Sequence, residues 1–233
     1  MTDLSKTAPQ NLNLTRRGFV SSAASAAFAF TIVPRHVLGG PGYIAPSEQL
    51  QVAGIGAGGM GGGDIATVSK LGANFVALCD VDDERAAGTL SAHPKARRYK
   101  DFREMIEKEA NNIDAVTVGT PDHIHAVAAM AAIKGGKHVY CQKPLTHTLL
   151  ECRELTKAAK AANVMTSMGK QGHATEGARL TNEWIQAGVI GDVRAVHVWS
   201  DRAGKHWKQG VGRPEDTPAI PATLDWNLWL GPI

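Results

Sequence analysis

The chain has 233 residues, of which 43% are hydrophobic and 20% are charged, and it contains no internal repeat. Its formal net charge of +3 arises within residues 1–40, which hold four basic side chains and one acidic one, so that 21 bases face 21 acids in the remainder. Because this remainder has no basic stripe with interleaved aromatic residues, we expect no nucleic-acid partner.

The first 45 residues have the pattern of an export signal rather than of a folded domain. A twin-arginine sequence, TRRGFV at 15–20, leads into an uncharged run of 14 small and apolar residues at 20–33. A helix that crosses a bilayer needs about 20 apolar residues, so this run fits a signal better than a stable membrane anchor. We therefore expect twin-arginine export, to the periplasm or the medium, with a linker at 34–46. The alternative is an alanine-rich surface helix behind a basic pair.

Residues 51–63 pass from a short apolar run into a glycine-rich turn, in which Gly56, Gly58 and Gly61 have the spacing G-x-G-x-x-G. In a dinucleotide-binding turn the first glycine permits a sharp bend, the second a close approach of the backbone to pyrophosphate, and the third close packing of the next helix. We expect that helix at about 62–71, with its free amides facing the phosphates. In a chain with 25 glycines, the spacing alone also fits a flexible loop.

A second apolar run, at 74–79, ends in Asp80, 19 positions after Gly61. A dinucleotide-binding unit carries at this place an acid that accepts hydrogen bonds from the adenosine ribose. The alternatives are an ordinary acid at a strand end and a cap for a helix that begins at about Asp83. Because strand, glycines and acid occur in register, the sequence favours the dinucleotide site.

Strands and helices alternate from residue 51 onward, which predicts βαβ units around a parallel sheet. We expect further strands at 114–118, 138–141, 164–168 and 193–200, short segments at 96–99 and 226–230, and helices at 83–90, 101–110, 122–134, 148–162 and 175–187. Cys79 and Cys141 fall in predicted buried strands, and with Cys152 they show no Cys-x-x-Cys spacing, so we expect free thiols.

Two polar clusters follow predicted strands, at the edge where ligands lie in open α/β sheets. In the first, Pro121 and Asp122 suit the first turn of the next helix, and a cofactor or substrate contact by His123 stays open. His123 and His125 are two positions apart and cannot share a helix face, so we expect no metal site there. In the second, Lys143 precedes a proline, which favours an extended backbone that projects the ammonium from the strand end; a solvated loop lysine is the alternative.

From the leader to Pro232 the chain resembles the secreted, twin-arginine branch of the Gfo/Idh/MocA oxidoreductases, a family that includes glucose-fructose oxidoreductase and inositol dehydrogenase. The resemblance rests on five motifs in order: Gly56-x-Gly58-x-x-Gly61, Cys79-Asp80-Val81-Asp82, Thr120-Pro121-Asp122-His123, Gln142-Lys143-Pro144 and Gly169-Lys170-Gln171-Gly172-His173. It implies an α/β fold with a Rossmann-type, doubly wound parallel sheet at 46–172, followed by the start of a C-terminal α/β substrate and oligomerisation domain at 173–233.

The resemblance also implies the roles of individual residues. Lys143 would be the catalytic lysine that hydrogen-bonds the reacting hydroxyl, with Gln171 and His173 near the substrate. The cofactor contacts would be Gly56, Gly58, Gly59, Met60, Gly61, Asp80, Thr120, Pro121, His123 and Gln142. Asp80 favours NAD over NADP, because its carboxylate repels a 2′-phosphate and the nearest basic candidate is Arg85.

Three features depart from the family pattern. Gln142 stands where glutamate is usual, and Lys170 stands where asparagine is common. The family's later Asp and His segment, which completes the acid/base machinery, has no match, and the 61 residues after residue 172 are too few to close an independent core. We therefore expect the front part of a longer protein, which would form a homo-oligomer when complete.

The expected reaction is hydride transfer between the nicotinamide and a secondary hydroxyl of a sugar, cyclitol or related polyol. One alternative is an NAD-dependent glycosidase of the same fold, which uses a transient oxidation and an elimination instead of the usual two carboxylates and regenerates its cofactor in each cycle. The other is a truncated nucleotide-binding module without turnover.

Overall fold

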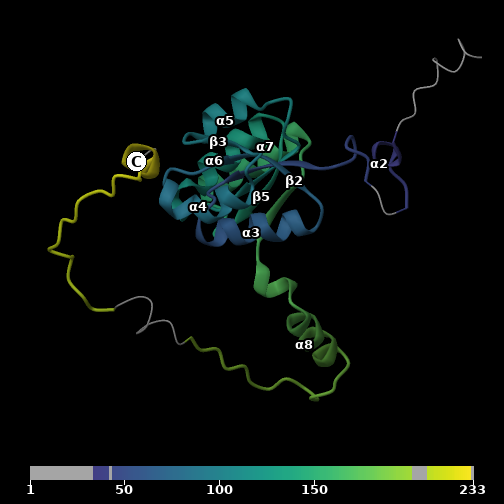
Figure 1. The fold of residues 1–233 in the computed structure, drawn as a ribbon. Helices are drawn as coiled ribbons and strands as arrows, with labels where there is room; N and C mark the ends of the chain where they lie inside the picture. The colour runs from purple at the N-terminus through teal and green to yellow at the C-terminus, as the bar shows by residue number, and fades with distance from the viewer. Residues whose placement is uncertain (1–33, 42–43, 201–208, 232–233) are drawn as a thin grey trace, which may run out of the picture. The chain divides into compact units, whose positions relative to one another are not determined.

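The computed structural model describes residues 34–41, 44–200 and 209–231 (Figure 1). The chain divides into two compact units, Met1–Gln49 and Leu50–Ile233. In the first unit the structure describes one helix, α2 (Arg35–Leu38), and the predicted export signal at 15–33 lies outside the described residues. Among the helices that are described, none is both long enough and apolar enough to cross a membrane.

The second unit is built on a sheet of six parallel strands in the order β3-β2-β1-β4-β5-β6. The strands are β1 (Gln51–Ile55), β2 (Asn74–Cys79), β3 (Arg97–Tyr99), β4 (Ala115–Val118), β5 (His138–Gln142) and β6 (Thr166–Gly169). The chain builds outward from β1 to β3 and then crosses back to place β4 against β1. This is the strand order of dinucleotide-binding sheets, with the switch point between β1 and β4, and the predicted fold class is confirmed.

Helices cover both faces of the sheet (Figure 1). They are α3 (Gly59–Lys70), α4 (Asp83–Ala92), α5 (Phe102–Lys108), α6 (His125–Lys134) and α7 (Leu149–Ala162), and the turn η1 (Asp122–Ile124) precedes α6. Neighbouring strand residues point to opposite faces. In β1, Val52 packs in a cluster with residues of α3 and α4, whereas Ala53 packs in a larger cluster with residues of α5, α6 and α7.

Most predicted elements occur within a few residues of their expected bounds. The helix after the glycine turn starts earlier than expected, at Gly59, and the helix at 122–134 begins as the 3₁₀ turn η1. The predicted strand at 193–200 is wrong, because these residues are exposed and adopt no regular structure. A strand needs a partner for its backbone N–H and C=O groups, and the described residues offer none at this place.

The chain after β6 forms the turn η2 (Gln171–Ala174), then α8 (Glu176–Gln186) and finally α10 (Trp226–Leu230). No residue of α8 is buried. Residues 221–231, which we call the return segment, contact the loop between β2 and α4. Leu224 forms an antiparallel bridge with Asp82, and the amide of Asp225 donates to the carbonyl of Val81 at 2.9 Å.

Candidate functional site: a dinucleotide cavity at the carboxyl edge of the sheet

The glycine turn between β1 and α3 requires its glycines for three different steric reasons. Gly56 has φ +84°, which favours glycine. A Cβ at Gly58 would lie 2.9 Å from Cγ and 3.0 Å from the carbonyl oxygen of Arg85 on α4, and a Cβ at Gly61 would overlap the carbonyl oxygen of Gly56. The restriction on Gly58 therefore comes from α4 as well as from the ligand approach that the sequence suggested.

Asp80 follows β2 and binds the glycine turn with its carboxylate. Its Oδ2 accepts hydrogen bonds from the amides of Ala57 at 2.7 Å and Gly58 at 3.1 Å, and its Oδ1 accepts from Asp82 at 2.9 Å. A carboxylate has about four acceptor positions, so one remains for a ribose hydroxyl. Asp80 thus fixes the shape of the turn, a structural role that the sequence analysis did not foresee.

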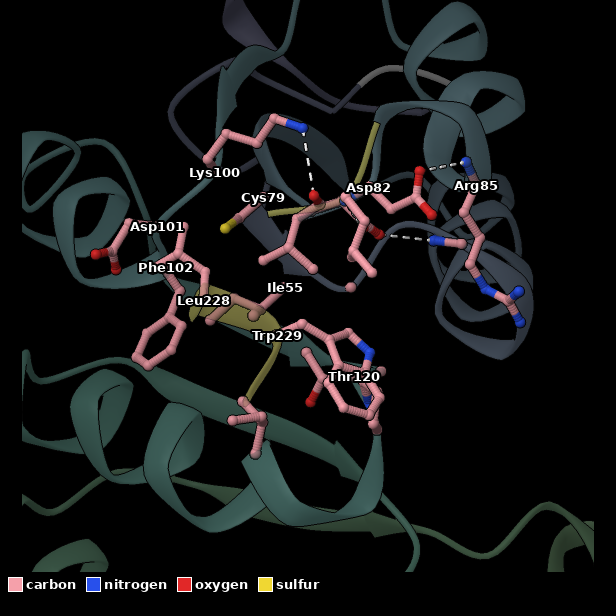
Figure 2. Close-up of a pocket in the computed structure, with 18 of the residues that line it drawn as sticks. Ile55, Cys79, Asp82, Arg85, Lys100, Asp101, Phe102, Thr120, Leu228 and Trp229 are labelled. Atoms are coloured by element: carbon pink, nitrogen blue, oxygen red, sulfur yellow. Dashed lines mark hydrogen bonds between the residues drawn. The ribbon is translucent and has the colours of Figure 1, made fainter. Parts of the chain in front are cut away.

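A cavity of about 460 Å³ opens beside the turn and Asp80 (Figure 2), within the size range of small-molecule sites. Its walls come from the ends of β1 to β4, from the start of the helices that follow them and from the return segment: Ile55, Gly56, Gly58, Cys79, Asp80, Val81, Asp82, Arg85, Lys100, Asp101, Phe102, Gly119, Thr120, Pro121, Ile124, Leu224, Trp226, Leu228 and Trp229. The buried Oγ1 of Thr120 has no hydrogen-bond partner among the described residues. A turn of glycines, one remaining acceptor on Asp80 and an unpaired hydroxyl fit the adenosine half of NAD.

Gln142 and Lys143 lie outside this cavity, at the carboxyl end of β5. Gln142 is 4% exposed, and its Nε2 donates to Oδ2 of Asp64 on α3 at 2.7 Å. Its Oε1 accepts from the amide of Lys143 at 3.3 Å, and the Lys143 side chain is exposed. The Lys143–Pro144 peptide is cis. Asp64 was not found by the sequence analysis, although its place one turn into the helix behind the glycines was a usable signal.

Asp64 also affects the neighbouring phenol of Tyr140 on β5. The pKa of Tyr140 is raised mainly by burial and, to a smaller extent, by the negative charge of Asp64. The Tyr140 hydroxyl lies 3.5 Å from Nε2 of Gln171, which donates to it. Asp64, Gln142, Tyr140 and Gln171 therefore form a polar group at the β5–β6 edge, close to Lys143.

His125 joins the loop after β4 to the loop after β5. It is 1% exposed, with Nδ1 at 2.6 Å from the carbonyl oxygen of Pro144 and Nε2 at 2.8 Å from that of Thr120. Both partners are acceptors, so the ring can donate to both only when both nitrogens carry hydrogen. The sequence analysis used His125 only to argue against a metal site; its place at the start of an apolar helix was the available signal for burial.

The other predicted site residues are spread over three places. Gly56, Gly58, Asp80, Thr120 and Pro121 line the cavity; Gly59, Met60 and Gly61 form the first turn of α3; Gln171 and His173 lie exposed in η2. His123 does not line the cavity. Its Nε2 lies 2.8 Å from the carbonyl oxygen of Trp229. The roles assigned to these residues remain predictions.

The cysteines near the site are poor nucleophiles. Burial raises the pKa of Cys141 to about 12, and burial together with the charge of Asp80 raises the pKa of Cys79 further. Both thiols are free and buried, as the sequence predicted, and Cys152 is free and partly exposed. In the described part of the chain, no three His, Cys, Asp or Glu side chains gather as metal ligands.

Comparison with known proteins agrees with this geometry. Residues 50–170 match the model of the Gfo/Idh/MocA family, an oxidoreductase family with an NAD-binding Rossmann fold. Inositol 2-dehydrogenase from Salmonella typhimurium is 31% identical over 166 residues, which are 68% of this chain and 47% of that protein. 1,5-Anhydro-D-fructose reductase from Ensifer adhaerens is 31% identical over 137 residues, which are 58% of this chain and 40% of that protein. The chain thus spans about half, or less, of the length of these relatives.

Solved structures show the same fold. The crystal structure of myo-inositol 2-dehydrogenase from Lactobacillus plantarum matches with a TM-score of 0.58 at 26% identity, over 62% of this chain and 43% of that one. An NAD-binding oxidoreductase from Klebsiella pneumoniae matches with a TM-score of 0.53 at 31% identity, over 61% of this chain and 40% of that one. Strand order, glycine turn and matched residues lead to one conclusion: the chain belongs to the Gfo/Idh/MocA oxidoreductase family, and residues 50–170 are its NAD-binding Rossmann domain.

Proposed function

We propose that the chain is the cofactor-binding part of an NAD-dependent oxidoreductase that acts on a secondary hydroxyl of a sugar, cyclitol or related polyol. The observation that carries the proposal is the position of Lys143 at the end of β5, two strands from the glycine turn of β1, while the adenosine cavity opens toward β2. The names of an inositol 2-dehydrogenase, a 1,5-anhydro-D-fructose reductase and a levoglucosan dehydrogenase among the relatives support this substrate class.

Each part of the site has a distinct task in this proposal. The free backbone amides of Gly59, Met60 and Gly61 at the start of α3 would bind the pyrophosphate. Asp80 and Thr120 would hold the adenosine ribose. NAD, when bound, supplies the acceptor or donor of hydride. The Lys143 ammonium would hydrogen-bond the substrate hydroxyl and assist its proton transfer.

A reaction without net oxidation is the second candidate. One relative is a 2,7-anhydro-N-acetylneuraminate hydratase from Escherichia coli, 30% identical over 102 residues, which are 42% of this chain and 27% of that protein. The glycosidase alternative is likewise redox-neutral overall. Absorbance at 340 nm separates the candidates, since only a net dehydrogenase accumulates reduced cofactor in proportion to product. A module without turnover would bind NAD and convert no polyol.

Replacement of Lys143 tests the proposed chemistry. In the complete enzyme, Lys143→Ala should lower kcat/KM about 10²- to 10⁴-fold, the usual effect of a positioned acid/base group, and leave NAD affinity within about threefold. Lys160→Ala, at an exposed position on α7, is the matched control and should change neither value. Near-normal turnover of Lys143→Ala would show that Lys143 is a solvated loop residue.

We further propose that the protein is exported and that it forms a homo-oligomer. The twin-arginine sequence at 15–20 and the 14-residue uncharged run behind it support export to the periplasm or the medium. A homo-oligomer is proposed from the family resemblance, through a C-terminal domain that residues 173–233 would begin.

A further inference from the structure

The return segment is tied to the loop that carries Asp80. Beside the Leu224–Asp82 bridge, the amide of Asp83 donates to the carbonyl of Thr223 at 3.4 Å, and the amide of Asp225 donates to that of Val81 at 2.9 Å. These backbone contacts join residues about 140 positions apart in the sequence. They fix one end of the segment directly beside the acid of the glycine turn.

The other end of the segment is tied to the loop after β4. Asp225 caps α10 by accepting from the amide of Leu228 at 3.0 Å. The carbonyl of Trp229 lies 2.8 Å from Nε2 of His123, and the two rings meet edge to face with centroids 5.0 Å apart. The segment therefore spans from the β2 side of the cavity to the β4 side, with an anchor at each end.

Between these anchors the segment presents apolar side chains to the cavity. Leu224, Trp226, Leu228 and Trp229 all line it, and Figure 2 shows Leu228 and Trp229 among the side chains around the space. The indoles of Trp226 and Trp229 stack nearly parallel, with centroids 5.0 Å apart and planes 8° apart. Trp226 keeps 39% of its surface exposed, and both indoles belong to the wall of the cavity.

The position of this aromatic surface identifies the group that would contact it. The glycine turn marks the pyrophosphate and Asp80 marks the adenosine ribose, whereas Lys143 lies on the opposite side of β4. Trp229 and Asp80 line the same cavity, which Lys143 does not reach, and the flat aromatic group that a dinucleotide carries next to its adenosine ribose is adenine. We propose that the return segment forms the outer wall of the adenine subsite, with the Trp229 indole packed against the base; this inference rests on NAD binding by the domain, not on turnover.

Binding measurements on the full chain test the proposal without reference to catalysis. Isothermal titration with NAD and with AMP should show that Trp229→Ala weakens both ligands by a similar factor of about 5- to 100-fold, the range for loss of one base–aromatic stack. Trp229→Leu should behave like the alanine variant while keeping an apolar side chain, and Trp229→Phe should stay within about threefold of the wild type. Trp184→Ala, on exposed α8, is the matched control and should bind normally.

Three results would overturn the inference. The first is NAD and AMP affinity within twofold of the wild type in both Trp229→Ala and Trp229→Leu. The second is tighter binding in these variants, which would make the segment a competitor of the cofactor. The third is an equal loss in Trp229→Phe, which would exclude aromatic stacking. Thermal melts check that each variant is folded. If the Trp229 variants keep the NAD affinity of the wild type and the kinetics still depend on Lys143, the proposed wall is wrong and the proposed function stands.

Discussion

Gln142 is a buried amide placed between a carboxylate and a backbone N–H. It donates to Asp64 at 2.7 Å and accepts from the amide of Lys143 at 3.3 Å, so the two ends of its side chain face opposite kinds of partner. An ionised glutamate, the usual family residue, could accept from the amide of Lys143 but could not donate to Asp64. In this chain the carboxylate next to residue 142 is that of Asp64 on α3, which accepts a hydrogen bond from Gln142.

Restoring glutamate at this position should therefore destabilise the protein. Gln142→Glu would place two carboxylates in contact, which costs about 1–3 kcal/mol for the lost donor and raises the pKa of one of them. A shared proton relieves the repulsion, so the loss of Tm should be large at pH 8 and small near pH 5. The double variant Asp64→Asn/Gln142→Glu should recover most of the loss, because an amide again faces a carboxylate.

Thermal melts against pH measure this effect. Gln186→Glu, at an exposed position on α8, is the control and should show little pH dependence. A Gln142→Glu protein as stable as the wild type at pH 8 would contradict the proposed role of Asp64.

We expect Asp80 to determine the preference for NAD over NADP. Its one remaining acceptor position suits a ribose hydroxyl and its charge repels a 2′-phosphate, whereas Arg85 lines the same cavity and would partly offset that repulsion. We expect NAD to bind at least about tenfold more tightly than NADP, a difference of ~1.4 kcal/mol. Asp80→Asn should reduce this ratio, since it removes the charge and keeps one acceptor. Titration of both cofactors decides the point, and equal or tighter NADP binding by the wild type would refute it.

The short edge strand β3 is held to α5 by a buried carboxylate. Glu109, 2% exposed at the end of α5, accepts from the Tyr99 hydroxyl at 2.6 Å and from Nδ2 of Asn112 at 3.0 Å, and it forms an ion pair with Arg97. Burial alone would raise the pKa of this carboxyl, but the hydrogen bonds and the arginine outweigh burial and hold the pKa below its usual value. Three polar partners thus compensate for burying the charge.

This network should make stability depend on pH in one direction. Because the folded-state pKa of Glu109 lies below the unfolded value of about 4.3, its contribution is present above that value and is lost as the pH falls through the folded pKa. Glu109→Gln should lower Tm at pH 7, and the difference from the wild type should shrink below about pH 4. Glu104→Gln removes an exposed pair with Lys108 and should change stability by less than about 1 kcal/mol. A Glu109→Gln deficit that is constant from pH 7 to pH 3 would exclude the ionised network.

Elements whose residues form local patterns could be predicted from the sequence. The glycine spacing, the acid after β2 and the alternating apolar runs are encoded within stretches of a few tens of residues, and their structure follows from steric limits and burial. The segment at 193–200 is likewise rich in apolar and β-branched residues, yet such a composition only favours an extended backbone. It does not supply the neighbouring strand that a ladder requires.

The residues that form the wall of the cavity could not be predicted from the sequence, because they come together only in the tertiary structure. Residues 226–230 were expected as a segment of no stated role, and the structure brings Trp229 to His123 across more than 100 positions of sequence. Neither residue carries a periodic signal of that contact. The link between Asp64 and Gln142 was hidden in the same way, because each side chain alone is unremarkable and only the packing of α3 on the sheet brings them together.

The three free cysteines of the domain are compatible with the proposed export of an already folded protein. Two of its thiols are buried and none is paired, so the described fold requires no oxidising compartment. In the proposed export route, the Rossmann domain would fold around NAD before export, and a pathway that accepts folded proteins would preserve that complex. The twin-arginine sequence lies in residues outside the described structure.

Replacement of the arginine pair tests the proposed export. Arg16→Lys/Arg17→Lys should leave the protein in the cytoplasm, while Arg35→Lys, a basic residue outside the pair, should be exported normally. Gly61→Ala should also be retained despite an intact signal, because its Cβ overlaps the carbonyl oxygen of Gly56 and prevents the glycine turn from forming. Cell fractionation with immunodetection of the four proteins, wild type included, measures the outcome. Normal export of the double-lysine variant would show that the arginine pair is not an export signal, and export of Gly61→Ala would show that export does not depend on a correctly formed cofactor turn.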